Sequence, residues 1–125
     1  MSDNNGPMVV VCNHADPPHV MPTLIMGASG VGIGEDVILF FCPGGAPAML
    51  KGELEKISDM KLKGLPDPVE LFNTILAEGG KVIVCELALE NKGIKVEDLR
   101  SDKIEIKTAP AFLLDAQGAG ITFTF

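Results

Sequence analysis

The chain has 125 residues, a formal net charge of −7 and a single arginine, so it lacks the clustered Lys and Arg that nucleic-acid binding requires. Its apolar runs fall short of the about 20 residues that span a bilayer, and Met1–Pro7 lacks the basic and apolar regions of a signal peptide. We therefore expect a cytoplasmic protein with one domain over residues 1–125, a frayed segment at residues 1–7, and three cysteines kept reduced.

Short apolar runs alternate with helix-like segments along the chain. The runs are rich in β-branched residues, as in buried parallel strands, and the helical segments are bounded by Asp, Pro or Gly. In chain order we predict a strand at 8–11, a helix at 20–26, a strand at 36–41, a helix at 48–57 interrupted by Gly52, a helix at 69–76, a strand at 81–84, a helix at 86–92, a helical turn at 95–99, a strand at 103–107, a helix at 111–117 and a strand at 121–125. This order predicts an α/β fold, a three-layer α/β/α sandwich with a mostly parallel five-stranded sheet.

The glycine-rich segment Gly27–Gly34 resembles a dinucleotide-binding loop only superficially. Such loops follow a strand and open a helix, whereas this segment follows a predicted helix and precedes a predicted strand. We therefore interpret Gly27–Gly34 as the loop that ends the first helix, and we expect no cofactor.

Three cysteines occupy equivalent positions in three strand units. Cys12, Cys42 and Cys85 each come directly after an apolar strand segment. If these strands are parallel, all three thiols lie at one edge of the sheet, where ligand and reaction sites of open parallel sheets collect. His14 would lie near the first thiol, and the turn Pro43–Gly45 would leave backbone N–H groups exposed beside the second.

Cys85 is the strongest candidate for a reactive thiol. It lies where the strand of Lys81–Val84 gives way to a short helix, and a helix N-terminus favours a thiolate through its free N–H groups and partial positive charge. Glu86 follows at once, either as a first-turn helix residue or as a nearby proton acceptor. Cys12, Cys42, His14 and Glu86 are therefore candidate auxiliary residues.

The chain resembles the DsrE/DsrF-like superfamily of small sulfur-trafficking proteins over nearly its whole length. The resemblance is carried by the segment Gly-x-Asp-Val-Ile-Leu-Phe-Phe, by Glu78-Gly79-Gly80, and by Lys81-Val82-Ile83-Val84-Cys85 followed by Gly93-Ile94 and Glu97-Asp98-Leu99. It implies an α/β/α sandwich that assembles as a homotrimer or homohexamer, with Cys85 at the position that carries a persulfide or a thiosulfate-derived group.

The resulting hypothesis is a sulfur carrier, sulfurtransferase-like, that accepts sulfane sulfur on Cys85 and passes it to a thiol of a partner protein or small sulfur compound. Two alternatives stay open. Cys12, Cys42, Cys85 and His14 form a Cys₃His set of the kind that zinc prefers, although they lack paired Cys-x₂-Cys spacing. The chain could also be a non-catalytic subunit of an oligomer, since its mean hydropathy of +0.30 indicates aliphatic surface to bury.

Overall fold

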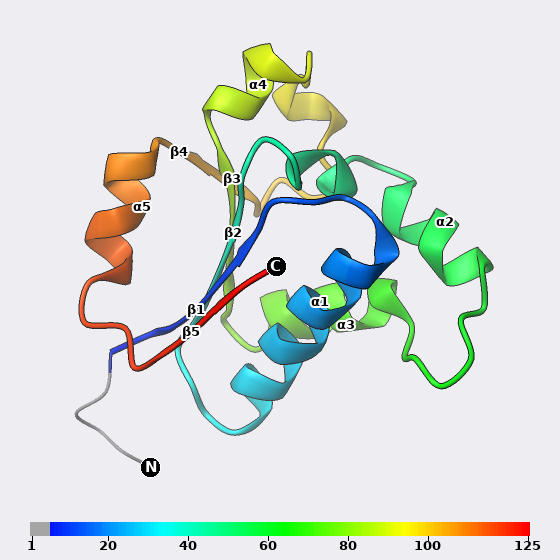
Figure 1. The fold of residues 1–125 in the computed structure, drawn as a ribbon, viewed down its shortest axis with the longest axis horizontal. Helices are drawn as coiled ribbons and strands as arrows, with labels where there is room; N and C mark the ends of the chain where they lie inside the picture. Colours follow the sequence, from blue (N-terminus) through cyan, green and yellow to red (C-terminus); the bar gives the residue numbers. More distant parts are fainter. Residues whose placement is uncertain (1–5) are drawn as a thin grey trace.

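The computed structural model describes residues 6–125 (Figure 1). Its elements are, in chain order, β1 (Met8–Cys12), α1 (Pro17–Gly32), β2 (Val37–Phe41), the 3-10 helix η1 (Ala46–Met49), α2 (Glu53–Asp59), α3 (Pro68–Ala77), β3 (Lys81–Cys85), α4 (Leu87–Asn91), the 3-10 helix η2 (Val96–Asp98), β4 (Glu105–Lys107), α5 (Ala109–Ala116) and β5 (Ile121–Thr124). Most of the segment expected to be frayed lies outside the described residues, while the Pro7 carbonyl accepts a hydrogen bond from the Gly120 N–H at 3.0 Å.

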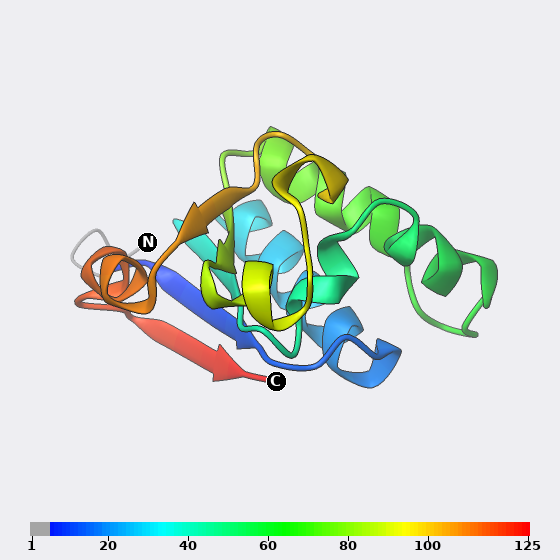
Figure 2. The same ribbon diagram turned by 90° about the horizontal axis from the view of Figure 1, so that it is seen from above.

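The five strands form one sheet in the order β4-β3-β2-β1-β5, and every pairing is parallel. The predicted α/β sandwich with a five-stranded sheet is therefore confirmed. Because all strands run the same way, their carboxyl ends meet at one edge, and the short helix α4 lies over that edge (Figures 1 and 2).

Helices cover both faces of the sheet, but unequally. In Figure 1, α1 and α3 lie on one side of the sheet and α5 lies alone on the other. The α1/α3 side buries the alternate strand residues Val10, Leu39, Phe41, Val82 and Val84, whereas the α5 side buries Val9, Ile38, Phe40 and Ile83. Phe112 of α5 stacks on Phe40 with ring centroids 4.0 Å apart. The face that buries Val9, Ile38, Phe40 and Ile83 is thus covered by α5 alone.

The prediction that Gly27–Gly34 forms a loop is wrong, because α1 continues to Gly32. The glycines serve close packing of the helix on the sheet. A Cβ atom at Gly30 would lie 2.6 Å from Met8 Sδ and 2.7 Å from Val37 Cγ2, and one at Gly27 would lie 2.9 Å from Ile75 Cδ1. The tertiary packing therefore overrides the low helix propensity of glycine.

The segment after β2 is also divided differently from the prediction. The expected helix at 48–57 is replaced by η1 and α2, which are separated by Gly52 at φ +85°. Farther on, Asp67 caps α3 by accepting a hydrogen bond from the Val69 N–H at 2.9 Å. Gly52 is thus a backbone break between two helices rather than an interruption within one.

Arg100 connects the chain after η2 to two helices. Its guanidinium donates two hydrogen bonds to the Glu55 carboxylate of α2, at 3.0 and 2.9 Å. It also lies 5.1 Å from the ring centroid of Phe72 in α3. Arg100 therefore joins α2 and α3 to the segment that follows α4.

Within residues 6–125, no helix combines the length and apolar character needed to cross a membrane.

Candidate active site

The three cysteines lie at the carboxyl edge of the sheet. Cys12 is the last residue of β1 and Cys85 the last of β3, while Cys42 directly follows β2. The strand register aligns Cys12 with Phe41 and Phe41 with Val84. Cys12 therefore lies one residue short of the level that Cys42 and Cys85 share.

This offset of one residue places Cys12 on the opposite face from the other two thiols, because successive side chains of a strand point to opposite sides. Cys12 is fully buried on the α1/α3 side, and its Sγ donates to the carbonyl oxygens of His14 at 3.2 Å and His19 at 3.7 Å. The thiols thus share an edge of the sheet but not one pocket. We interpret Cys12 as a core residue.

Cys42 and Cys85 lie on the same face, the one covered by α5. Cys85 is 3% exposed and packs among Phe40, Ile83 and Phe112, and Cys42 packs against this cluster while remaining partly exposed. Burial raises the pKa of the Cys42 thiol, and the neighbouring Cys85 and Cys12 thiols raise it further. The fold therefore brings together one buried and one accessible thiol on adjacent strands.

Two glycines allow the loop after β2 to pack on the loop after β1. A Cβ atom at Gly44 would lie 2.2 Å from the Asn13 carbonyl oxygen, and one at Gly45 would lie 2.3 Å from that of Cys12. The Cys42 N–H donates to the Cys12 carbonyl at 3.0 Å. This close approach sets the position of Cys42 beside β1 and β3.

The backbone N–H groups of Gly44, Gly45 and Ala46, in the turn after Cys42, all donate hydrogen bonds within the protein. The Gly44 N–H donates to Asn13 Oδ1 at 3.1 Å, and the Gly45 and Ala46 N–H groups donate to the Cys42 carbonyl at 2.8 and 2.9 Å. The expectation that the turn Pro43–Gly45 leaves backbone N–H groups exposed beside Cys42 is therefore wrong. Closing the turn satisfies them internally.

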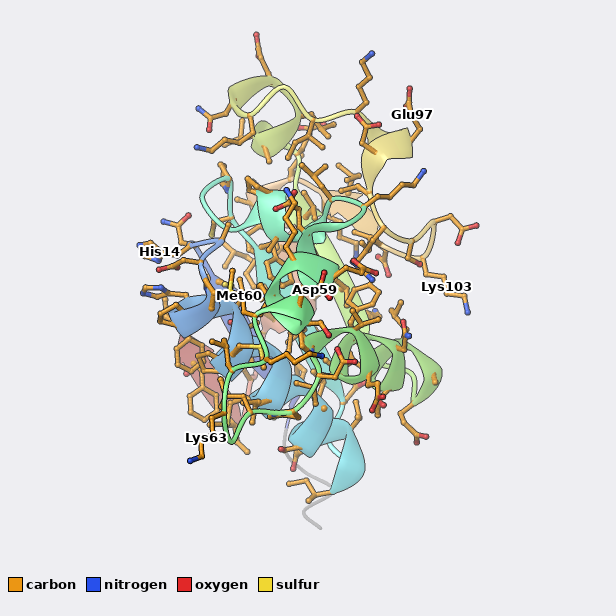
Figure 3. The ribbon with its side chains drawn as sticks, turned by 90° about the vertical axis from the view of Figure 1, so that its right-hand side faces the viewer. His14, Asp59, Met60, Lys63, Glu97 and Lys103 are labelled. Atoms are coloured by element: carbon orange, nitrogen blue, oxygen red, sulfur yellow. The ribbon has the colours of Figure 1, made fainter. Side chains whose placement is uncertain are left out.

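His14 lies at the surface beyond the end of β1 (Figure 3). Its ring stacks on that of His19 with centroids 4.1 Å apart, and His19 Nδ1 contacts Asp16 Oδ1 at 2.6 Å. The contact between His14 and Cys12 is made by the backbone carbonyl rather than by the imidazole. The structure thus pairs His14 with His19, on the side of Cys12.

A metal centre is not supported by the described part of the chain. Within residues 6–125, no three or more His, Cys, Asp or Glu side chains gather in a group that could hold a metal ion. The proposed set of Cys12, Cys42, Cys85 and His14 is divided by the sheet, since Cys12 faces away from Cys42 and Cys85. The Cys₃His alternative therefore lacks its geometry.

Glu86 is exposed at the N-cap of α4, and its side chain makes no capping hydrogen bond there. Its N–H donates to the Lys107 carbonyl at 2.9 Å, which fastens the end of β3 to β4. The structure therefore gives Glu86 a backbone role at the junction after Cys85.

Lys107 is a neighbour of Cys85 in the sheet that sequence reasoning missed. It is the register partner of Cys85 on β4, and its ammonium pairs with Asp115 of α5 and lies 3.5 Å from Glu105. The hydrogen bond from Lys107 to Asp115 raises the pKa of Lys107 and lowers that of Asp115. Because Asp115 belongs to α5, the ammonium lies on the same face as Cys85. The alternating sequence of residues 103–107 predicts that Lys107 and Ile106 point to opposite faces of the sheet. Only the pairing of β3 with β4 shows that Lys107 lies beside Cys85.

A surface hollow of about 440 Å³ borders this edge of the sheet. It is lined by Pro43, which follows Cys42, and by Leu87, Glu90 and Asn91 of α4. Leu87 is 66% exposed. The hollow thus lies between Pro43, which follows Cys42, and α4, which begins two residues after Cys85.

One of the comparisons with known proteins bears on the fold. No family model matches the chain. The uncharacterized protein MJ0760 of Methanocaldococcus jannaschii is 37% identical over 75 residues, which is 60% of this chain, and the chain spans about a quarter of that protein's length (26%). The crystal structure of the YchN protein from E. coli superimposes with a TM-score of 0.75 at 20% identity, covering 96% of this chain and 99% of YchN. This likeness supports the α/β fold that the sequence predicts.

Proposed function

We propose that this protein is a sulfur carrier that holds sulfane sulfur or a thiosulfate-derived group on Cys85 and passes it to a partner thiol. The observation that carries the proposal is the placement of Cys85 beside Cys42, on one face at the carboxyl edge of a parallel sheet. Ligand sites in such sheets collect at that edge. The DsrE/DsrF-like fold is compatible with sulfur trafficking.

The chemistry is thiol exchange. The Cys85 thiolate attacks the outer sulfur of a donor persulfide, an S–S bond forms at Cys85 Sγ, and the donor leaves as a thiolate. With tetrathionate, the same attack leaves a thiosulfate-derived group on Sγ and releases thiosulfate. Transfer onward to an acceptor thiol reverses the first reaction. The expected location is the cytoplasm, where thiols persist in the reduced form.

Adduct mass measurement tests this proposal. The protein is incubated with polysulfide, thiosulfate or tetrathionate, and its intact mass is compared with those of the Cys12→Ser, Cys42→Ser and Cys85→Ser variants. We expect a stoichiometric adduct that Cys85→Ser reduces and Cys12→Ser leaves unchanged. Absence of any adduct, or an equal adduct on Cys85→Ser, would refute the carrier function.

The burial of Cys85 favours one rival, a non-catalytic subunit. A side chain that is 3% exposed is shielded from a protein-sized partner unless the site opens. Sulfur uptake by the folded protein separates the carrier from the subunit. Uptake of sulfur from polysulfide on Cys85 in the folded state supports the carrier, and a Cys85 that takes up sulfur only on unfolding supports the subunit.

We further propose that copies of this chain assemble as a homotrimer or homohexamer. Three leucines around the α5 face and the carboxyl edge stay exposed: Leu87 at 66%, Leu113 at 60% and Leu114 at 68%. Such exposed leucines are suited to burial between subunits. Light scattering after size-exclusion chromatography measures the mass in solution. A monodisperse monomer would contradict the assembly, and Leu113→Ser with Leu114→Ser is expected to shift a multimer toward monomer.

A further inference from the structure

Cys42 and Cys85 lie at the ends of two paired strands, Cys42 directly after β2 and Cys85 as the last residue of β3. The parallel register aligns Phe41 with Val84, and each cysteine comes one residue later in its segment. Both side chains lie on the α5 face, where Cys42 packs against the cluster that contains Cys85. Neighbouring strands lie about 4.8 Å apart, so the two thiols are adjacent across the sheet rather than merely at the same edge.

The spacing suits the passage of one sulfur atom between the two thiols. An S–S bond is about 2.05 Å long, so two such bonds end to end span about 4.1 Å. A sulfane sulfur attached to Cys85 would thus reach Cys42 Sγ with little movement of the strands.

The two thiols differ in exposure. Cys85 is 3% exposed beneath α5, whereas Cys42 is partly exposed and is followed by Pro43, which lines the hollow beside α4. A protein-sized thiol meets Cys42 first. We propose that Cys42 is the exchange thiol of this protein, relaying sulfane sulfur between outside partners and the buried storage thiol Cys85. This inference rests on the proposed carrier function and deepens it.

The relay step balances without an added reactant. Cys42 Sγ attacks the outer sulfur of the Cys85 persulfide, and a new S–S bond forms at Cys42 while the bond to Cys85 Sγ breaks. Cys85 Sγ leaves with the electron pair and takes up the proton that Cys42 gives up. The transferred sulfur keeps its oxidation state, and the reverse step loads Cys85 from Cys42.

The experiment loads wild-type protein and the Cys42→Ser, Cys85→Ser and Cys12→Ser variants with polysulfide. The loaded proteins then discharge to a thiol carried on polyethylene glycol, which is too bulky to enter the α5 face. Sulfur is located by alkylation, cleavage after glutamate and mass spectrometry. Glu35 and Glu78 lie between the cysteines, so each thiol is carried on its own peptide. Thermal melts establish that each variant is folded.

We expect wild type and Cys12→Ser to carry sulfur on the Cys42 and Cys85 peptides and to discharge at the same rate. Cys42→Ser should hold sulfur on Cys85 and discharge it slower by roughly tenfold or more, because release then waits for local opening. Polysulfide could instead fail to load Cys42→Ser while it loads Cys42 of Cys85→Ser. That result would show that sulfur also enters the protein through Cys42.

Three results would overturn the relay. Discharge of Cys42→Ser at the wild-type rate removes the role of Cys42 and leaves the carrier function intact. Undiminished loading of Cys85→Ser removes the role of Cys85 as the storage thiol, and impaired discharge of Cys12→Ser contradicts the separation of the thiols by the sheet. If wild-type protein accepts no sulfur at all, the carrier function itself fails.

Discussion

The substitution Gly45→Ala tests whether the close approach of two loops sets the position of Cys42. The added Cβ would lie 2.3 Å from the carbonyl oxygen of Cys12, 3.0 Å from its carbonyl carbon and 3.4 Å from the His14 nitrogen. These are backbone atoms, so none can rotate away. Gly45 itself has φ −98° and ψ −18°, which alanine adopts freely, so the whole cost is steric.

Relief of this clash requires the two loops to separate by about 1 Å, since ordinary contacts begin near 3.4 Å. Overpacking of this kind costs roughly 1–3 kcal/mol, which lowers the Tm of a domain of this size by roughly 4–12 °C. The separation also stretches the hydrogen bond from the Cys42 N–H to the Cys12 carbonyl. We therefore expect Cys42 to react faster with a maleimide.

Circular dichroism during urea unfolding measures the stability change, because the chain contains no Trp or Tyr to report by fluorescence. Gly32→Ala is the matched control, since its added Cβ meets no atom within 4 Å. At the end of α1 it should be neutral or stabilising by up to about 1 kcal/mol. A Gly45→Ala protein with wild-type stability and wild-type Cys42 reactivity would refute the proposed role of the loop contact.

Three further predictions concern the packing around the site. Arg100→Lys should lower the Tm, because lysine cannot reproduce the paired hydrogen bonds to Glu55 or the planar contact with Phe72; an unchanged melting curve would contradict this. The hydrogen bonds from Arg100 hold the pKa of Glu55 below its usual value, and because the Glu55 side chain is half exposed, the pair contributes about 0.2–1 kcal/mol. That contribution is present above the unfolded pKa of about 4.3 and is lost as pH falls through the lower folded pKa, so the Tm difference between wild type and Glu55→Gln should disappear in acid. Phe112→Ala should cost roughly 3–5 kcal/mol and should speed maleimide labelling of Cys85, because Phe112 covers that face; equal labelling rates in folded wild type and variant would show that α5 does not control access.

Much of the fold is encoded locally. The β-branched runs that end at Cys12, Cys42 and Cys85 predict buried strands wherever they occur in the chain, and the structure places a strand at each. Alternation of strands and helices then restricts the architecture to a parallel sheet covered on both faces. The position of every thiol at a strand end therefore follows from composition and periodicity.

The sharing of a pocket by these thiols depends on register, which is a property of strand pairs. A shift of one residue moves a side chain to the other face of the sheet, and such a shift separates Cys12 from Cys42 and Cys85. The pairing of β3 with β4 likewise brings Lys107 beside Cys85 from a segment 22 residues later. The sequence around each cysteine does not predict which residue lies beside it on the neighbouring strand.

The glycines show the same division between local and tertiary information. In isolation, Gly27–Gly34 has the composition of a loop, yet α1 continues through Gly30 because the helix packs closely on Met8 and Val37. The sequence by itself determined the order of the elements and the residue at each strand end, since both depend on short-range patterns. Only the tertiary structure decided which faces meet and which thiols are neighbours, because those depend on contacts between segments far apart in the chain.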